Sequence, residues 1–194
     1  MAGREFHDGA KDGLEALEPL DPEKIHSFTE LLEAMRKTAF GGRRLGEAYE
    51  TLAAMIEDPD CKVVLTLSGA MTIAKMGKII STMIDRGMVQ AIVSTGALVA
   101  HGLSESVGKL HYRHEPSHTD EELFQKGYNR VYDTLEMESN LNYVEHVVSQ
   151  TMKRLNVDQP LSSNFLTREL GKTLAEEFEG PGILKSAYLK NVPV

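Results

Sequence analysis

The sequence predicts an α/β fold built around a parallel sheet. Two short β-branched runs, "KVVLTLS" (62–68) and "MVQAIVS" (88–94), show little polar alternation, which is typical of parallel strands covered on both faces. Each run leads through a turn of small residues into a helical segment. This order of strand, helix, strand and helix implies a right-handed crossover between parallel strands. The pattern therefore predicts a Rossmann-like parallel sheet with flanking helices.

A helical N-terminal extension is predicted ahead of the sheet. Residues 1–20 are polar and contain glycine, which predicts a flexible N-terminal arm, and residues 21–194 are expected to form the folded part. Asp21-Pro22 has the form of an N-cap followed by proline at the first helical position, and Gly41-Gly42 is expected to end that helix before a second one begins. The positions expected to face the core are Ile25, Phe28, Leu31, Leu32 and Met35 in the first helix and Leu45, Tyr49, Leu52 and Ile56 in the second.

The helices next to the two strands are predicted from their apolar periodicity. The run "AMTIAKMGKIISTMIDRG" (70–87) predicts a helix, with Gly87 as its C-terminal glycine. A helix over about 98–107 is expected after the second strand. The positions predicted to point inward from the first of these helices are Met76, Ile79, Ile80 and Met83, and core positions are also expected for Met71 and Met88.

The C-terminal half of the chain is predicted to be mainly helical. Residues 108–138 look irregular apart from a helical turn at "DEELFQKG", and the runs "EMES" and "EEFE" are typical of solvated charged faces. Val192-Pro193-Val194 resembles the start of a buried strand. Because two parallel strands do not form a stable sheet by themselves, the sheet is predicted to be incomplete at its C-terminal side. Three helices are expected, over about 140–155, 163–178 and 181–190.

Composition argues against several classes of protein. The 194 residues are 41% hydrophobic, which suits a folded domain, and the net charge of -8 argues against a nucleic-acid partner. Cys61 is the single cysteine, so an internal disulfide or a cysteine-based zinc site is excluded. No apolar run approaches the roughly 20 residues that cross a bilayer, and the first residues lack the apolar region of a signal peptide. A cytoplasmic protein is therefore expected.

The two strand-to-helix turns, "TLSGAMT" and "STGALVA", are the first candidate site. They are expected at the carboxyl ends of adjacent parallel strands, where helix N-termini offer free N–H groups to anionic ligands. Neither turn has the G-x-G-x-x-G fingerprint, so nucleotide binding and an ordinary turn both remain open from the pattern. His101 follows the second turn, which makes it a candidate acid/base or ligand-orienting group, and a histidine without a function is the alternative.

A second group of histidines lies further along the chain. His111, His114 and His118 have H-x₂-H-x₃-H spacing and could hold a metal together with Glu115 or Asp120. The spacing matches no standard site, and a solvated loop is the alternative. We therefore assign no metal ligand, and whether this loop binds anything stays open.

Four segments together resemble one known family. The central one is "KVVLTLSGAMTIAKMGKIISTMIDRGMVQAIVSTGALVAHGL", and "MRKTAFGGRRLGEAYETLAAMI" precedes it. "GYNRVYDTLEMESNLNYVE" and "FLTRELGKTLAEEFEGPGILKSAYLKNVPV" follow. In order and spacing these segments are similar to motifs of the deoxyhypusine synthase family, and the resemblance covers about residues 30–194.

The resemblance implies an activity, a cofactor and an assembly. Members of the family bind NAD at the interfaces of a homotetramer and oxidise spermidine. They pass its aminobutyl group, through an imine on an enzyme lysine, to a lysine of a translation factor. Carried over position by position, the expected NAD-contacting residues are Ser68, Gly69, Ala70, Met71, Thr72 and Ile73 in the first turn and Thr95, Gly96 and Ala97 in the second.

The chain departs from the well-studied synthases in both turns. Those enzymes have Thr-Ser-Asn where this chain has Ser68-Gly69-Ala70, and a Glu-Glu pair where it has Ala100-His101. A carboxylate pairs with a protonated amine, whereas a neutral imidazole offers one acceptor. A histidine in this place is expected of the bacterial deoxyhypusine synthase-like branch, and His101 is the predicted substrate-binding residue.

The resemblance also predicts that this chain carries part of a site. In the well-studied members the imine-forming lysine and further NAD and amine contacts come after the Pro-Val that corresponds to Pro193-Val194. We therefore assign no catalytic residue and expect either a homo-oligomer or a complementary C-terminal half as partner, with spermidine or a related polyamine as substrate. The alternative is a non-catalytic truncated paralogue or regulatory subunit that binds a full-length partner.

Overall fold

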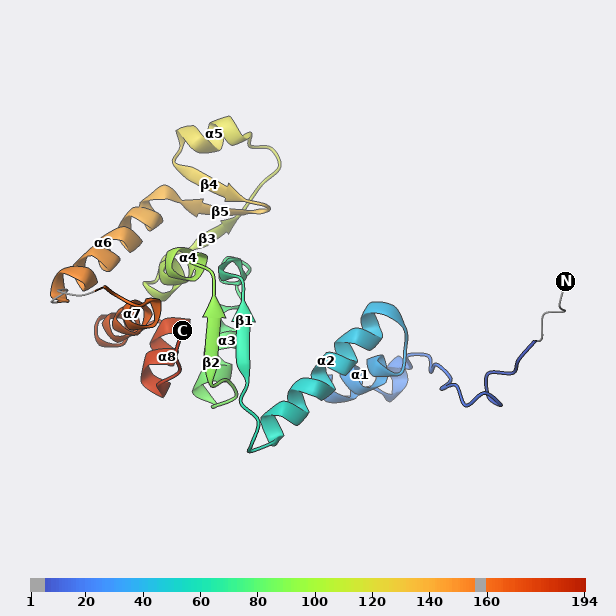
Figure 1. Cartoon of the computed structure of the whole chain (residues 1–194). Helices are drawn as coiled ribbons and strands as arrows, with labels where there is room; N and C mark the ends of the chain where they lie inside the picture. Colours follow the sequence, from blue (N-terminus) through green and yellow to red (C-terminus); the bar gives the residue numbers. More distant parts are fainter. Residues whose placement is uncertain (1–5, 156–159) are drawn as a thin grey trace, which may run out of the picture. The chain divides into compact units, whose positions relative to one another are not determined.

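The computed structural model describes residues 6–155 and 160–194, which are drawn in colour in Figure 1. The chain forms two compact units, Met1–Cys61 and Lys62–Val194. The first five residues of the predicted arm lie outside the described residues, and residues 6–20 are exposed and contain neither helix nor strand. Within the described ranges, no helix combines the length and the apolar character that crossing a membrane requires.

The first unit contains a short 3-10 helix and two α-helices. They are η1 (Pro22–Lys24), α1 (Phe28–Arg36) and α2 (Phe40–Glu57). Asp21 caps η1 by accepting a backbone hydrogen bond, as the sequence predicts. The chain then becomes extended at Ile25, and α1 begins after a new N-cap, Ser27. The predicted single helix from Pro22 is therefore wrong.

A close approach at Gly46 sets the packing of α1 on α2. A Cβ atom on Gly46 would lie 2.5 Å from the backbone nitrogen of Arg36, so a larger residue would push the helices apart. Gly41-Gly42 does not separate the helices as predicted, because both glycines lie in the first turn of α2. Three side chains that were expected in the core are 86%, 52% and 37% exposed, namely Phe28, Leu45 and Leu52.

The second unit holds the remaining elements in the predicted order of strand, helix, strand and helix. They are β1 (Val64–Leu67), η2 (Gly69–Met71), α3 (Gly77–Asp85), β2 (Ala91–Ser94), α4 (Ala97–Ser106), β3 (His111–Arg113), α5 (Asp120–Gln125), β4 (Tyr128–Val131), β5 (Thr134–Met137), α6 (Glu138–Arg154), α7 (Ser163–Glu177) and α8 (Ile183–Lys190). The fold class predicted from the sequence is confirmed.

The parallel pair of β1 and β2 has helices against one face. Figure 1 shows α3 behind the two strands, and Ile84 of α3 joins Ile92 of β2 in the core. On the opposite face Val64 is 54% exposed and Val93 is 60% exposed. The prediction that these strands are covered on both faces is therefore wrong for the described residues. Val64 and Val93 therefore form an exposed apolar strip on this open face.

The helix predicted over 70–87 is broken into two pieces. The 3-10 turn η2 follows β1, and the chain adopts a left-handed conformation at Lys75, with a φ of 64°, before α3 begins. This break rotates the helix relative to the predicted pattern, so Ile79 is 58% exposed instead of inward, and Met71 is also exposed. Gly87 follows α3 with a φ of 74°, which confirms its predicted role as the C-terminal glycine.

The structure contains a three-stranded antiparallel sheet that the sequence patterns do not predict. Its strand order is β3, β5, β4, and it occupies much of the segment predicted to be irregular. The register places Glu136 of β5 opposite His111 of β3. Glu136 is 1% exposed, so the interpretation of "EMES" as a solvated charge run is wrong at this residue. The predicted helical turn at "DEELFQKG" is confirmed as α5, which begins with a capping box at Thr119.

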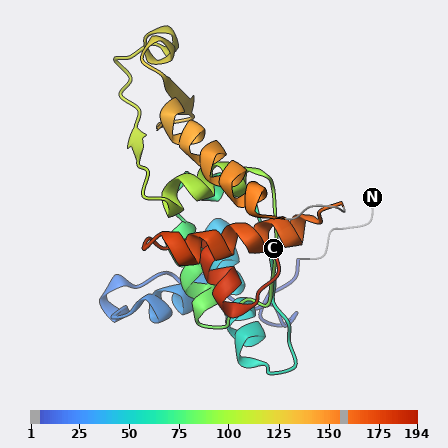
Figure 2. The ribbon, with the colours of Figure 1, turned by 90° about the vertical axis from the view of Figure 1, so that its left-hand side faces the viewer.

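The last three helices form as predicted and connect both sheets. Figure 2 shows α6 running from the antiparallel sheet towards α7 and α8. A Cβ atom on Gly171 of α7 would lie 2.3 Å from the carbonyl oxygen of Leu184, so α8 packs closely against α7. Beyond α8, the carbonyl of Pro193 accepts a hydrogen bond of 2.9 Å from the N–H of Ile92. Residues 192–194 therefore lie beside β2, on the side opposite β1, but they form no strand and are not buried, unlike the predicted start of a buried strand.

Candidate functional site

The two predicted turns meet at the carboxyl ends of β1 and β2. The N–H of Gly69 donates to Oγ1 of Thr95 at 3.0 Å, which joins the first turn to the second. A Cβ atom on Gly69 would lie 2.2 Å from the backbone nitrogen of Leu98, at the start of α4. Gly69 is therefore required for the packing of one turn on the other, and it is buried by that contact.

The turns differ in the backbone donors that they offer. The N–H groups of residues 69–72 all have partners within the two turns. The N–H groups of Gly96 and Ala97, at the start of α4, have none among the described residues. A Cβ atom on Gly96 would have no atom within 4 Å. The second turn therefore presents free donors and open space, as an anion-binding helix N-terminus does.

The predicted NAD-contacting residues differ in burial, and among them Gly69 is buried and Ala97 is half-buried. Thr72 is 1% exposed and Ile73 is 6% exposed, and the hydroxyl of Thr72 donates to the carbonyl of Gly69 at 2.6 Å. These two residues hold the first turn together from inside. The residues that face solvent are Ser68, Ala70, Met71, Thr95 and Gly96.

His101 lies one helical turn after Ala97 and contacts a buried carboxylate. Its Nδ1 is 2.5 Å from Oε2 of Glu136, on β5. Ser104, also on α4, donates its hydroxyl to Oε1 of the same carboxylate at 2.7 Å. The side chain of His101 is 23% exposed, whereas that of Glu136 is 1% exposed. The antiparallel sheet that the sequence did not predict thus supplies a buried negative charge directly behind the predicted substrate residue.

The neighbours of Glu136 keep it ionised. Burial alone would raise the pKa of this carboxyl, because a charge is costly away from water. The contacts with His111, Ser104 and His101 outweigh burial and lower its pKa from 4.5 to about 2. At neutral pH Glu136 is therefore a carboxylate that only accepts hydrogen bonds.

His111 belongs to this cluster and not to a site with the other two histidines of its loop. Its Nε2 lies 3.3 Å from Oε1 of Glu136, without the geometry of a good hydrogen bond, and its Nδ1 lies 3.1 Å from Nζ of Lys75. His114 instead contacts the carbonyl of His118. The predicted H-x₂-H-x₃-H grouping therefore does not converge in the structure.

The cluster also has the composition of a metal site. The ligand atoms of His101, His111 and Glu136 lie within 4.8 Å of one another. However, Nζ of Lys75 can only donate, so Nδ1 of His111 must accept the hydrogen bond between them. The ring proton of a neutral His111 then lies on Nε2. This is the atom that would have to bind the metal. The 2.5 Å contact of His101 is likewise the length of a hydrogen bond. The geometry favours a cluster in which Glu136 accepts hydrogen bonds from His101 and Ser104, with His111 close by.

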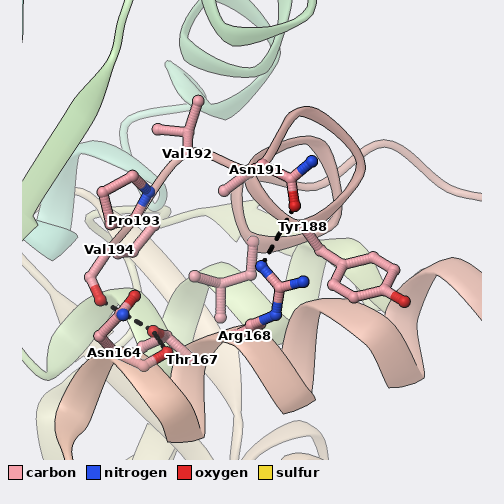
Figure 3. A pocket seen from close by; sticks show the side chains of 10 residues that line it. Asn164, Thr167, Arg168, Tyr188, Asn191, Val192, Pro193 and Val194 are labelled. Atoms are coloured by element: carbon pink, nitrogen blue, oxygen red, sulfur yellow. Dashed lines mark hydrogen bonds between the residues drawn. The ribbon is translucent and has the colours of Figure 1, made fainter.

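A separate pocket of about 290 Å³ lies between α7, α8 and residues 192–194, as Figure 3 shows. Arg168 reaches across the pocket to Oδ1 of Asn191 at 3.2 Å and lies over the ring of Tyr188, and Thr167 donates to the carbonyl of Val194 at 2.8 Å. None of the predicted site residues lines this pocket.

Comparisons with known proteins agree with the motifs. The family model described as deoxyhypusine synthase matches residues 30–194. A protein of Methanosarcina acetivorans called "Probable deoxyhypusine synthase 2" is 35% identical over 179 residues, which are 91% of this chain and 51% of that protein. A "Deoxyhypusine synthase-like protein" of Elusimicrobium minutum is 31% identical over 183 residues, 93% of this chain and 48% of its own length.

A solved structure shares the fold. It is described as a putative deoxyhypusine synthase from Entamoeba histolytica and superposes with a TM-score of 0.60 at 13% identity, over 91% of this chain and 62% of that one. The fold and the two turns thus define an α/β protein whose strand-to-helix turns meet at the carboxyl edge of a parallel sheet. The matches place it more narrowly: the chain belongs to the deoxyhypusine synthase family. It spans about half the length of the curated relatives that it matches.

Proposed function

We propose that this chain supplies the NAD-facing side of a site that transfers an aminobutyl group from spermidine or a related polyamine to an acceptor amine. In the well-studied members of the family the acceptor is a protein lysine. The observation that carries the proposal is the second turn, where Gly96 and Ala97 offer free N–H groups. The first turn lies beside it and is joined to it by the hydrogen bond from Gly69 to Thr95. Family membership supports the same reaction class.

NAD fits the donor set of the second turn. Free N–H groups at the start of a helix bind phosphate oxygens through hydrogen bonds and the helix dipole. Thr95 adds a hydroxyl, and Ser68 and Ala70 add exposed surface from the first turn. Thr72 and Ile73 are buried, so we propose that they support the cofactor site by holding the turn in shape. NAD, when bound, supplies the acceptor for a hydride from the amine.

The amine side of the site is proposed to begin at His101. A polyamine is a cation, and the nearest carboxylate behind His101 is Glu136. This carboxylate cannot reach a ligand directly because it is 1% exposed, but its charge acts on the imidazole that does reach the surface. We propose that the histidine and the buried glutamate together replace the Glu-Glu pair of the well-studied members of the family.

A partner is proposed to complete the site. The chain corresponds to about half of its relatives, and Val64 and Val93 leave an apolar strip exposed on the sheet. A complementary C-terminal half or further copies of the chain, a tetramer in the family, would cover such a surface. Light scattering of the purified chain is expected to show association that rises with concentration. A monomer at high concentration would contradict this proposal.

Calorimetric titration with NAD tests the cofactor proposal. Gly96→Val places a side chain over the free N–H groups where no atom lies within 4 Å, at a φ of -56° that valine tolerates. We expect NAD to bind the unaltered chain and to bind this variant at least about tenfold more weakly, a loss of about 1.4 kcal/mol. Gly41→Val is the matched control, because a Cβ atom there also meets no atom within 4 Å.

Two results would contradict the cofactor proposal. One is the absence of NAD binding to the unaltered chain, which would favour a non-catalytic paralogue. The other is equal binding by the Gly96 and Gly41 variants. The partial-site proposal has its own test: the isolated chain with NAD and spermidine is expected to form no NADH, and sustained NADH formation would refute it.

A further inference from the structure

The buried carboxylate of Glu136 determines where the ring proton of His101 lies. An ionised carboxylate has acceptors and no donor. The low pKa of Glu136 means that it stays ionised at neutral pH. The proton in the 2.5 Å contact with Nδ1 of His101 must therefore be on the imidazole. Nδ1 carries a proton whether the ring as a whole is neutral or cationic.

The other ring nitrogen is the atom left to exchange a proton. Nε2 of His101 has no hydrogen-bond partner among the residues that the structure describes, and it is not among their buried unpartnered atoms. The side chain is 23% exposed, so a ligand beside the second turn can reach this ring. A neutral His101 thus presents Nε2 as an acceptor, and a cationic His101 presents it as a donor.

We propose that Glu136 is a positioning residue that locks the proton of His101 on Nδ1, so that Nε2 is the one atom through which His101 accepts and releases a proton. The carboxylate comes from β5 and the imidazole from α4, so the antiparallel sheet has a direct part in the site. The role of Glu136 was not visible in the sequence motifs.

The surrounding side chains hold the carboxylate in place. Ser104 donates to Oε1, which fixes the orientation of Glu136 towards His101. His111 directs its Nε2 at the same oxygen from 3.3 Å, while Lys75 lies against the opposite nitrogen of His111. Lys75 is in turn paired with Glu105 at 3.3 Å. These six groups place two carboxylates, Glu136 and Glu105, beside one ammonium, Lys75.

The inference rests on the proposed function for its chemical meaning. An alkylammonium substrate must lose a proton before its carbon can give up a hydride. In that step an N–H bond of the ammonium breaks, a bond forms between the proton and Nε2, and the products are a neutral amine and an imidazolium. Glu136, one hydrogen bond away, keeps its contact with Nδ1–H through this step, so that only Nε2 changes its proton. No other reactant is needed for the proton transfer.

Nitrogen NMR of the full chain tests the proposal without cofactor or amine. The chain has seven histidines, so the His101 signals are assigned from a spectrum of His101→Gln. Long-range proton–nitrogen spectra are recorded between about pH 5 and 8, where imidazoles titrate. Nδ1 of His101 is expected to keep the shift of a protonated nitrogen throughout, while Nε2 changes. The Nδ1–H form of the neutral ring is expected to exceed the other by at least about tenfold.

Two variants separate positioning from a general effect on the fold. Glu136→Gln removes the charged acceptor, and both nitrogens of His101 are then expected to change shift with pH. Glu105→Gln removes a neighbouring carboxylate of α4 that pairs with Lys75, and it is expected to leave the His101 signals as in the unaltered chain. Backbone amide spectra of each variant report whether the chain is folded.

The outcomes are decisive even if Glu136→Gln fails to fold. A change of Nδ1 with pH in the unaltered chain would overturn the proposal, and so would a predominant Nε2–H form. A loss of the Nδ1 proton on adding zinc chloride would show a metal site and would also overturn it. Because no NAD or polyamine is present, these results stand apart from the calorimetric test of the proposed function.

Discussion

The two turns at the carboxyl edge of the sheet look alike in sequence but are held in opposite ways. In the first turn every backbone N–H group of residues 69–72 already has a hydrogen-bond partner. Gly69 also packs against the start of α4. The second turn is open, since Gly96 and Ala97 have free N–H groups. The helix that follows the second turn, α4, is instead held by the contacts of His101 and Ser104 with Glu136 of β5.

This difference shows that glycine serves two purposes in one site. At Gly69 the missing side chain allows two backbones to touch, whereas at Gly96 it leaves open space, which we propose a ligand fills. The first turn therefore acts as support and the second as the surface proposed to bind the cofactor. Substitutions at the two turns and at Glu136 separate these roles.

The largest effect is expected from Gly69→Ala. The added methyl group would lie 2.2 Å from the backbone nitrogen of Leu98, and neither backbone can move without parting the turns. We expect a loss of about 4 kcal/mol in the free energy of unfolding, at the upper end for overpacking. Urea unfolding measures it. Gly96→Ala is the control and is expected to change the free energy of unfolding by less than about 0.5 kcal/mol. Equal losses of stability in the two variants would contradict the difference between the packed first turn and the open second turn.

A smaller effect, which depends on pH, is expected from Glu136→Gln. The pKa of Glu136 is about 2 in the folded chain against a usual 4.5, so its ionised form stabilises the fold above about pH 4.5 and this contribution is lost as the pH falls towards 2. The variant is expected to be about 2–3 kcal/mol less stable at pH 7. The difference should shrink in acid. Unfolding curves at a series of pH values check this, and a difference that does not change with pH would contradict it.

The smallest effect is expected from Thr95→Val. This change keeps the shape of the side chain and removes the oxygen that accepts the N–H of Gly69 at 3.0 Å. The loss of one hydrogen bond is expected to cost about 1 kcal/mol. Hydrogen exchange at the Gly69 amide should become faster. Thr66→Val is the control, since the Thr66 hydroxyl makes no hydrogen bond within the described residues and its side chain is exposed. Unchanged exchange at Gly69 would show that Thr95 does not join the turns.

The sequence predicts the parallel pair and its helices because their signals are local. β-Branched runs followed by small turns and periodic helices predict β1, β2 and α4, and the family motifs point to the same turns. The break at Lys75 escaped prediction, because a left-handed residue other than glycine or asparagine leaves no sequence signal. The rotation of α3 that places Ile79 in solvent follows from that break.

The antiparallel sheet and Glu136 could not be predicted for a different reason. Its strands have three or four residues each, and Leu135 and Glu136 are both buried, so the alternation that marks a half-exposed strand is absent. An acidic residue is buried there only because three polar side chains from other elements surround it. His101 could be found from its place after a turn, but its partner could be found only from the structure.

The most direct test of the account is an amide NMR titration of the chain with NAD. If the second turn is the open one, the Gly96 and Ala97 amides should show the largest shifts. The amides of residues 69–72, already hydrogen-bonded, should move less. The predicted result is that the amide shifts of Gly96 and Ala97 change with NAD until they reach a plateau. In Gly96→Val the Ala97 shift is expected to stay unchanged. NAD-dependent shifts that leave Gly96 and Ala97 unchanged would contradict the account.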